Sequence, residues 1–372
     1  MKILHIISGL GVGGAETMLA QLAPRLQQRG FIQRVVSLRG DGPRAQDLQK
    51  QGIAVEAFQL SPGWRAAPAL LRIVALIHSF RPQVIQGWMY HGDLVAALAH
   101  RLAPGYRDRR LFWGIRASNM DDRRYGHLLR WSARLSQWPD LVVANSAAGA
   151  SHHLRMGYRP RRLEVIPNGV DVDRFRPNPD ARDRLRAELA IPADACVAIH
   201  VARVDPMKDH AIGIAALGQL PNVFGLFVGD GTETLPLPAN ARGLGRRADV
   251  ADLYSTADMI LSTSAFGEGF SNALIEGMSS GLLPIASDVG DARAIVGDTG
   301  AIVAPGDLTA LVHAIREPAD MPHDARRMRG VAARNRICDL YSLDRAVDRF
   351  AAFYSQYGAN SIAQPRCARQ TL

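Results

Sequence analysis

The chain has 372 residues, 47% of them apolar and 21% charged, and its formal net charge is +9. The length suggests two domains, and the composition excludes both a disordered chain and one embedded in a membrane. No apolar run forms a signal peptide or approaches the ~18 residues of a spanning helix. The 3 dispersed cysteines provide neither a disulfide framework nor a metal site, which favours a cytoplasmic protein.

The positive charge lies in the first half of the chain. Residues 1–177 carry 25 lysines and arginines against 12 acidic residues, whereas residues 178–372 carry 19 against 23. All five tryptophans also fall in the first half, namely Trp64, Trp88, Trp113, Trp131 and Trp138. The two halves are therefore expected to differ in surface chemistry. Lys208 is the only lysine of the second half, which makes it a candidate for a specific role.

Short apolar runs alternate with longer helical patterns along the first half. We expect strands at residues 2–8, 34–38, 54–59, 83–88, 110–115, 141–145 and 163–166, and helices at 16–29, 42–51 and 67–80. This alternation predicts a parallel sheet with helices on both faces. Turn-forming residues then cluster at 167–171 and 176–179, where we place the linker between two domains.

The same pattern restarts after the linker. Strands are expected at residues 197–201, 223–228, 259–262 and 283–286, and helices at 210–220, 250–257, 271–280, 324–339 and 343–357. The fold class is therefore α/β, with two doubly wound parallel-sheet domains. We predict an N-terminal domain over residues 1–170, a C-terminal domain over 171–340, a helix over 341–357 and a frayed tail over 358–372.

A glycine-rich loop, GLGVGGAE at residues 9–16, follows the first predicted strand and opens a helix. Gly9, Gly11 and Gly14 fit a dinucleotide-binding pattern, in which backbone amides at a helix start face an anion. Such a fold usually places an acidic residue after the second strand. Here Arg39 stands there, which suits the 2′-phosphate of NADP. The loop alone is therefore compatible with an NADP-dependent oxidoreductase. It is equally compatible with glycines that only allow a tight turn and bind no ligand.

The second half has sharper features at the ends of its predicted strands, where open α/β sheets bind ligands. Arg203 and Lys208 flank a turn and suit two charges that converge on a diphosphate. Glu268 lies in a later loop, and Glu276 lies two turns into a helix that is apolar at most positions. Because buried carboxylates need partners, these two glutamates are candidates for binding hydroxyl groups.

Taken together, these motifs resemble those of the retaining glycosyltransferases of family 4, which have the GT-B fold. The resemblance covers residues 1–357 and rests on GGAE at 13–16, NGVD at 168–171, the Arg203 and Lys208 pair, LG at 244–245 before DVADLY at 249–254, and the Glu268 to Glu276 segment followed by Gly281 and Pro284. It implies two Rossmann-like domains that face a cleft, and a C-terminal helix that crosses back to the first domain.

The resemblance also implies roles for the motif residues. Arg203 and Lys208 would hold the diphosphate, Glu276 would bind the ribose, and Glu268 would bind the donor sugar. The amides of Phe270, Ser271 and Asn272 would bind phosphate or sugar oxygens. The backbone of Gly245 and Arg246 would face the base, and Gly13 and Gly14 would approach the phosphate or sugar. Relatives have closely spaced histidines after the fourth strand, and His91 is the only candidate here. Arg116 and Asn145, at later strand ends, are further candidates.

Asp171 and Asp173 form a D-x-D pattern that binds metals in another glycosyltransferase fold. Here the pair belongs to the linker motif, and we expect turn and capping roles. We predict no catalytic metal and no cofactor, because Arg203, Lys208 and the helix start would stabilise the leaving group.

The resulting function hypothesis is the transfer of a hexose or N-acetylhexosamine from a nucleotide diphosphate sugar, with UDP as the nucleotide, to a hydroxyl of a glycan or lipid-linked acceptor. The alternatives are the NADP-dependent oxidoreductase and a non-catalytic nucleotide-sugar-binding protein on the same scaffold. No nucleic-acid partner is expected.

An anionic membrane surface is a further predicted partner, through residues 101–138. Within this segment, arginines accompany Trp131 and several leucines in a candidate amphipathic helix at 123–135. Basic residues near anionic lipid and an interfacial tryptophan favour reversible attachment on the inner face of the plasma membrane. The alternative is an ordinary arginine-rich surface with its tryptophans in the core.

Overall fold

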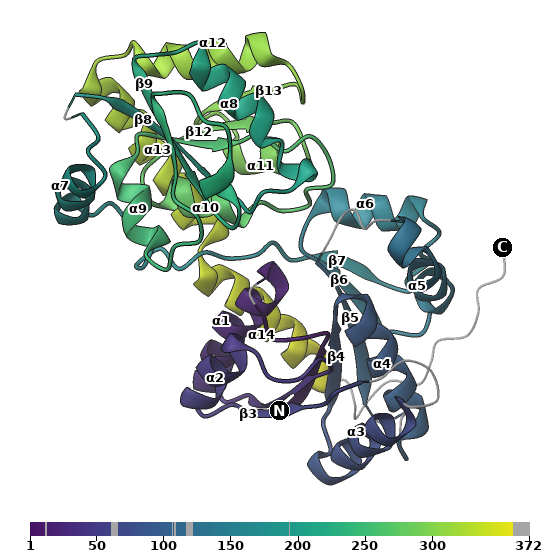
Figure 1. The fold of residues 1–372 in the computed structure, drawn as a ribbon. Helices are drawn as coiled ribbons and strands as arrows, with labels where there is room; N and C mark the ends of the chain where they lie inside the picture. The colour runs from purple at the N-terminus through teal and green to yellow at the C-terminus, as the bar shows by residue number, and fades with distance from the viewer. Residues whose placement is uncertain are drawn as a thin grey trace.

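The computed structural model describes residues 1–11, 13–60, 66–105, 107, 109–116, 122–192 and 194–359. Two parallel sheets organise them. One sheet has seven strands in the order β3-β2-β1-β4-β5-β6-β7, and the other has six in the order β10-β9-β8-β11-β12-β13. Figure 1 shows the two sheets in separate bodies joined by narrow connections. The predicted pair of doubly wound domains is confirmed, whereas the predicted limits of each domain remain a prediction.

The N-terminal sheet is covered by helices on both faces. Its strands are β1 (Lys2–Ile7), β2 (Ile32–Ser37), β3 (Ala54–Ala57), β4 (Val84–Trp88), β5 (Arg110–Ile115), β6 (Leu141–Ala144) and β7 (Leu163–Val165). Its helices are α1 (Gly14–Gln28), α2 (Pro43–Lys50), α3 (Ala67–Phe80), α4 (Met89–Leu102), α5 (Asp122–Leu135) and α6 (Ala147–Arg155). Apolar side chains of α1 and α2 pack on one face, and those of α3, α4, α5 and α6 pack on the other.

The C-terminal sheet is built in the same way. Its strands are β8 (Cys196–Val201), β9 (Val223–Val228), β10 (Ala241–Gly243), β11 (Met259–Ser262), β12 (Leu283–Ser287) and β13 (Ala301–Val303). Its helices are α7 (Pro179–Glu188), α8 (His210–Gly218), α9 (Val250–Thr256), α10 (Asn272–Ser279), α11 (Ala292–Val296), α12 (Leu308–Ala319) and α13 (His323–Tyr341). Helices α8 and α12 cover one face, and the others cover the opposite face.

The chain passes between the domains twice, and the two passages run side by side. The Val170 amide donates to the Tyr341 carbonyl at 2.9 Å, and the Leu343 amide donates to the Val170 carbonyl at 2.8 Å. A Cβ atom on Gly169 would overlap the backbone of Leu343, so this position needs glycine for the close approach. The NGVD motif therefore pairs the linker with the returning chain.

The last helix, α14 (Leu343–Ala359), packs on the N-terminal domain, as the sequence predicted. Its apolar side chains join the core beside β1 and α1, and they are Leu343, Ala346, Val347, Phe350 and Tyr354. Figure 1 shows this yellow helix lying among the purple N-terminal elements. Trp88 and Trp113 are also in the core, whereas Trp131 is 56% exposed. Residues 358 and 359, the first two of the predicted tail, end α14. Trp64 and the rest of that tail, from residue 360 onward, lie outside the described residues.

Candidate functional site

Several predicted site residues meet at the carboxyl ends of the C-terminal strands. Lys208, in the turn after β8, forms an ion pair with Glu268, in the loop after β11. The Ser264 hydroxyl donates to the same Glu268 oxygen, Oε2, at 3.1 Å. The Lys208 and Glu268 side chains are only 22% and 13% exposed, so their charges interact in a partly desolvated place. The structure thus joins two residues that were assigned to different ends of the donor.

The turn that carries Lys208 is held by hydrogen bonds to residues at the ends of β8 and β11. The Thr263 hydroxyl bonds to the carbonyl oxygens of Lys208 at 2.9 Å and Asp209 at 3.0 Å, and buried His200 bonds to the same hydroxyl. Asp209 adopts a left-handed backbone with φ of 44°, and its carboxylate caps the first turn of α8. A non-glycine residue in this conformation is strained and persists only where surrounding contacts hold it. The bonds from Thr263 supply such contacts, and they keep the turn with Lys208 in one position.

Arg203 has no such support. Its guanidinium donates to Asp205 Oδ2 through Nε at 3.2 Å and Nη2 at 2.8 Å, and its side chain is 68% exposed. The paired contact keeps the arginine at the same turn as Lys208, but solvent still reaches it. Its predicted diphosphate role remains a prediction, and the geometry makes Lys208 the better positioned of the two cations.

The start of α10 offers unpaired backbone donors. Ser271 caps this helix by accepting from the Leu274 amide at 3.4 Å. In the described part of the chain, no protein group accepts from the amides of Phe270, Ser271 or Asn272. Such groups at a helix start, together with the helix dipole, favour an anion. The arrangement agrees with the phosphate role predicted for these three amides and does not test it.

Glu276 lies further along α10 and contacts a neighbouring helix. The Tyr254 hydroxyl, from α9, donates to Glu276 Oε2 at 3.2 Å. Burial raises the pKa of Glu276 to about 7, and the hydrogen bond from Tyr254 only partly offsets this rise. Close to neutral pH, the carboxyl group is therefore near its point of half-ionisation. It can change between accepting and donating hydrogen bonds within the physiological range.

The glycine loop faces α10 across the cleft. A Cβ atom on Gly14 would lie 3.1 Å from Asn272 Nδ2, and Gly14 and Glu276 line one small interdomain cavity of about 20 Å³. Gly13 precedes α1 in an extended conformation, with φ of -144°. The loop thus approaches the predicted ligand residues of the other domain, and any side chain at Gly14 would crowd Asn272.

Asn272 also joins the domains through a chain of polar contacts. Its Oδ1 accepts from Asn168 Nδ2 at 2.9 Å, and Asn168 Oδ1 accepts from Arg116 Nη1 at 2.9 Å. The Arg116 guanidinium stacks on Trp88, 4.6 Å from the ring centroid. Arg116 therefore contacts the linker and the core, and its candidate role in ligand binding remains untested. Asn145 is also buried, at 5% exposure.

His91 lies in the first turn of α4 and is half-buried. Burial lowers its pKa, and the charge of Arg39 lowers it further, so the imidazole is neutral at pH 7. Two backbone features place it: Met89 has a φ of 64°, and a Cβ atom on Gly92 would overlap the Ile6 carbonyl of β1. A neutral histidine can accept or donate one hydrogen bond to a sugar hydroxyl, which is compatible with its predicted role.

Gly245 and Arg246 follow β10, the strand at the sheet edge. Gly245 has a φ of 62°, its amide donates to Thr232 Oγ1 at 3.0 Å, and its carbonyl accepts from the Gly229 amide at 2.8 Å. Both backbone groups are therefore already engaged, although the carbonyl keeps a second lone pair. Arg246 is exposed. Their predicted contact with the base remains untested.

The D-x-D residues form a turn. Asp171 Oδ1 accepts from the amides of Asp173 at 3.2 Å and Arg174 at 3.1 Å, while Oδ2 pairs with Arg25 at 2.8 Å. These contacts are the predicted turn and capping roles, with an added ion pair to α1. Within the described residues, no group of three histidine, cysteine or acidic side chains is arranged to hold a metal ion.

Sequence reasoning missed the residues that support the site. Thr263 and Ser264 come directly after β11, so the rule that favoured Arg203 applied to them as well. The hydroxyl of Tyr254 gave no signal of its own. Asp291 also escaped notice: its carboxylate accepts from the Ala147 amide at 2.8 Å and the Ala148 amide at 2.9 Å, at the start of α6 in the other domain.

Two sequence-family profiles match this chain. The one described as Glycosyltransferase Family 4 matches residues 12–174, and the one described as Glycosyl transferases group 1 matches residues 195–320. They fall on the N-terminal and the C-terminal sheet respectively.

Individual relatives agree with these profiles. Lipopolysaccharide core biosynthesis glycosyltransferase LpsD of Rhizobium meliloti (strain 1021) is 27% identical over 335 residues, 87% of this chain and 89% of LpsD. D-inositol 3-phosphate glycosyltransferase of Mycobacterium avium (strain 104) is 30% identical over 217 residues, 52% of this chain and 49% of that protein. The crystal structure of Anabaena Alr3699/HepE in complex with UDP-glucose is 26% identical and superposes with a TM-score of 0.82, covering 96% of this chain and all of that one.

Proposed function

Because this chain belongs to the family 4-like glycosyltransferases with the GT-B fold, we propose that it transfers a hexose or N-acetylhexosamine from a UDP-linked donor, with retention of the anomeric configuration. The acceptor is a hydroxyl of a glycan or a lipid-linked sugar. The name of LpsD, which refers to lipopolysaccharide core biosynthesis, supports a role in bacterial surface polysaccharide or glycolipid synthesis.

One observation carries the proposal: the Lys208–Glu268 pair lies beside the start of α10, where three amides have no acceptor among the described residues. A cation and backbone donors suit a diphosphate, whereas a carboxylate suits sugar hydroxyls. The two chemistries of a nucleotide sugar therefore meet within one loop. The UDP-glucose complex of HepE, a structure that superposes over nearly all of this chain, supports the same donor class.

In the proposed reaction, the bond between the anomeric carbon and the diphosphate breaks, and the acceptor oxygen bonds to the same face of that carbon. The departing diphosphate takes the electron pair, and the acceptor proton passes to it. Lys208, Arg203 and the α10 amides would stabilise the new charge, so the proposal includes no metal and no cofactor. Glu268 and His91 would orient the sugar, and Glu276 would hold the ribose.

Two experiments test this function. Calorimetric titration with UDP and with NADP separates a glycosyltransferase from the oxidoreductase alternative, because only the former should bind UDP. Incubation with a panel of UDP-sugars and lipid-linked acceptors, followed by NMR of the product's anomeric linkage, tests transfer and retention. Binding of UDP-sugars without any product would instead favour the non-catalytic alternative.

A membrane surface is the second part of the proposal, and exposed side chains favour it. Trp131 on α5 is 56% exposed, and Leu98 and Leu102 on the neighbouring α4 are 44% and 58% exposed. Arg134 lies over the Trp131 ring, at 5.6 Å from its centroid. Exposed apolar side chains with an arginine beside the tryptophan suit an anionic bilayer. No helix among the described residues has the length and apolar character to cross a membrane.

Vesicle sedimentation tests this attachment. Binding should require anionic lipid, weaken in high salt and drop when Arg123, Arg124 and Arg130 are changed together to alanine. The side chains of Arg123 and Arg124 lie outside the described part of the chain, so Trp131→Ala provides an independent variant. Equal binding to neutral and anionic vesicles would contradict the proposal.

A further inference from the structure

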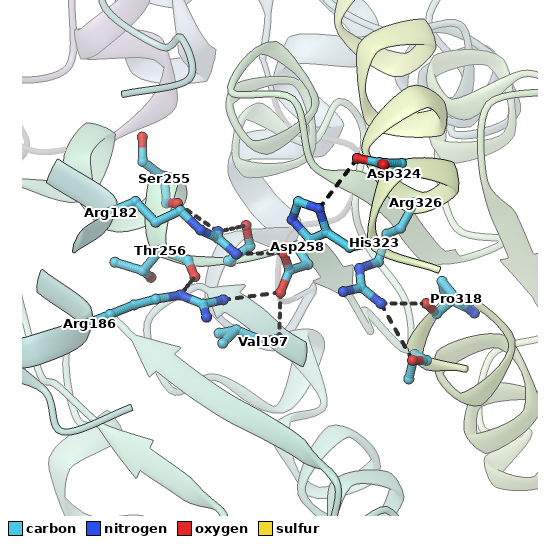
Figure 2. A network of polar contacts seen from close by, with 12 residues as sticks. Arg182, Arg186, Val197, Ser255, Thr256, Asp258, Pro318, His323, Asp324 and Arg326 are labelled. Atoms are coloured by element: carbon cyan, nitrogen blue, oxygen red, sulfur yellow. Dashed lines mark hydrogen bonds and ion pairs between the residues drawn. The ribbon is translucent and has the colours of Figure 1, made fainter. Parts of the chain in front are cut away.

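A group of arginines lies at the opposite end of the C-terminal sheet from the proposed donor site. Arg182 and Arg186 are one turn apart on α7, and Arg326 lies on α13; we call these three residues the arginine cluster. Asp258, which precedes β11, lies beside them, whereas Glu268 follows the other end of that strand. Figure 2 shows Asp258 beside Arg182 and Arg186, and Arg326 on the side of Pro318.

The carboxylate of Asp258 pairs with both Arg182 and Arg186, whereas Arg184, the third arginine of α7, pairs with Asp252. Asp258 Oδ1 accepts from Arg182 Nη2 at 2.8 Å, and Oδ2 accepts from Arg186 Nη2 at 3.2 Å and from the Val197 amide at 2.8 Å. The Asp258 side chain is 8% exposed. Both oxygens of Asp258 are therefore engaged by Arg182, Arg186 and the Val197 amide. Neither oxygen bonds to Arg326.

Arg326 is buried without a carboxylate. It is 9% exposed, and its Nη1 donates to the carbonyl oxygens of Pro318 at 2.9 Å, Ala319 at 3.4 Å and Met321 at 3.5 Å. No acidic side chain of the described residues forms an ion pair with it, and its Nε has no partner. The carbonyl groups at the end of α12 offset part of the cost of burying this charge. They do not neutralise it.

Two adjoining hollows lie between α7 and α13, and Arg182, His323 and Arg326 line both. The smaller has a volume of about 300 Å³ and is also lined by Arg327; among the described residues that line it, Asp258 is the only acidic one. Two other aspartates lie just behind its wall: Asp252 accepts from Asn178, and Asp324 lies 3.8 Å from His323. The arginines that line it are Arg182, Arg326 and Arg327; counted against the one lining carboxylate, they give its wall an excess of two positive charges. The rest of its wall includes Asn178, Ser255 and Ser280, and the apolar residues Pro177, Leu282 and Val331.

We infer that the smaller hollow binds the phosphate group of a small phosphorylated metabolite. A phosphate monoester carries about -1.5 to -2 charges at pH 7, which matches the excess of positive charge. Guanidinium groups form paired hydrogen bonds with phosphate, and Arg326 is already held in one orientation by its main-chain contacts. The apolar wall would take the carbon part of the ligand. A monocarboxylate carries one negative charge and would leave one of the two excess positive charges unpaired.

This site is separate from the proposed donor site. It joins α7, the first helix after the linker, to α13, and Pro177 of the linker lies in its wall. A ligand here would therefore stabilise the C-terminal domain where the linker enters it, independently of the residues proposed to bind the donor. The inference does not depend on the proposed function.

Titration of the full chain with inorganic phosphate and with glycerol phosphate tests the inference, by calorimetry at constant ionic strength. Saturating UDP is present throughout, and the titration is repeated in Lys208→Ala without UDP, so that phosphate binding at the donor site does not contribute. Arg327→Ala should weaken binding about fivefold, as expected for one exposed ion pair. Arg326→Gln should weaken it tenfold or more, as expected for a buried charged donor.

Arg329→Ala is the matched control, because it removes one positive charge from the same helix. Arg329 pairs with Glu317 and lines neither hollow, so its loss should leave phosphate binding unchanged. Unchanged binding in Arg327→Ala would overturn the inference, and so would equal weakening in Arg327→Ala and Arg329→Ala, which would indicate general attraction to a basic surface. If Arg326→Gln fails to fold, Arg327→Ala alone decides between these outcomes.

Discussion

The two domains share one architecture but use their polar residues differently at the cleft. In the C-terminal domain, residues at the ends of neighbouring strands hold the candidate ligand-binding side chains: Thr263 bonds to the turn that carries Lys208, and Ser264 donates to Glu268. In the N-terminal domain, Arg116 bonds to Asn168 of the linker, and the first amides of α6 bond to Asp291 of the other domain. The candidate site residues of the C-terminal domain are thus held by their own domain, whereas these polar groups of the N-terminal side contact the linker and the other domain.

This difference suggests how one fold serves many reactions. A nucleotide diphosphate is a common part of many donors, so a rigid set of groups for it can be kept while the opposite face varies. Preorganised charges stabilise a transition state without reorganising when the reaction occurs. We therefore expect the largest effects of substitution on the C-terminal side, and smaller ones at contacts between the domains.

The largest effect should follow from Lys208→Ala. This change removes the partly buried cation that would stabilise the departing diphosphate, so kcat/KM should fall roughly 10²- to 10³-fold, as for other preorganised donors. Arg203→Ala should cost less, because Arg203 is 68% exposed and held only by Asp205. Steady-state kinetics with the identified donor measures both. Lys50→Ala, on α2 of the other domain, is the control; a wild-type kcat/KM in Lys208→Ala would contradict the comparison.

Glu276 allows a test of the cost of this preorganisation. Its pKa is about 7 in the folded protein against 4.5 for an ordinary glutamate, so between these values the folded state binds more protons than the unfolded state. Folding stability due to this group therefore falls as pH rises from 4.5 to 7 and stays low above pH 7. Glu276→Gln avoids this loss and should be roughly 2–3 kcal/mol more stable than the wild type at pH 8.

Urea unfolding at pH 8 and at pH 4.5 measures this difference, which should vanish at the lower pH. Asp258→Asn is unsuitable as a control, because it would disrupt the arginine cluster. Glu233→Gln is better, because Glu233 is an exposed residue in a neighbouring loop of the same domain. Equal stability of Glu276→Gln and the wild type at pH 8 would show that the buried carboxylate costs nothing.

The sequence predicted the fold well because alternating apolar periods and turn residues specify a doubly wound sheet locally. It missed α4, α6, α7, α11 and α12. The starts of α4 and α6 depend partly on other segments: the turn before Gly92 lies against β1, and Asp291 accepts from the first amide of α6. Helices α7 and α12 begin at the local side-chain caps Asn178 and Asp307, which the sequence analysis did not use. The short edge strands β10 and β13, of three residues each, were too brief for a periodic signal. Only the contacts that fix the starts of α4 and α6 are tertiary, and one strand or helix does not encode those.

The candidate site divides in the same way. Arg203, Lys208 and Glu268 could be proposed because they follow strands of a parallel sheet, and Glu276 because it is a carboxylate in a largely apolar helix. Their pairing could not, because Lys208 and Glu268 are 60 residues apart and meet only when two loops fold together. The link from Arg116 through Asn168 to Asn272 likewise spans three separate segments.

A third prediction separates the two glutamates by ligand. Glu276→Ala should weaken binding of UDP itself, whereas Glu268→Ala should spare UDP and weaken only the UDP-sugar, because Glu268 is assigned to the sugar. Calorimetry with both ligands measures this division. Equal losses for both ligands in both variants would show that the assignment is wrong.

The ionisation of Glu276 adds a pH dependence to UDP binding. The carboxylate accepts hydrogen bonds from ribose hydroxyls, and below pH 7 it becomes protonated, so the UDP affinity of the wild type should fall by up to about tenfold per pH unit. The ligand also titrates, and Glu276→Gln corrects for this because it retains the ligand's own pH dependence. Parallel profiles for the two proteins between pH 6 and 8 would contradict the prediction.

The smallest effect should come from the contact between the domains at Asp291. Its carboxylate is the only protein acceptor seen in the described residues for the first two amides of α6, and its own amide donates to the Gly269 carbonyl, beside Glu268. Asp291→Ala should leave UDP affinity unchanged but lower kcat about three- to tenfold. The lost cap is worth about 1 kcal/mol. Because it holds the two domains in the arrangement in which the reaction occurs, its loss raises the activation free energy by a similar amount. Spin labels on α6 and α12 should report a broader distance distribution between the domains. Asp288→Ala is the control, because Asp288 lies in the same loop and, among the described residues, its only ion pair is with Arg293. Similar behaviour of the two variants would show that the N-terminal side needs no such contact.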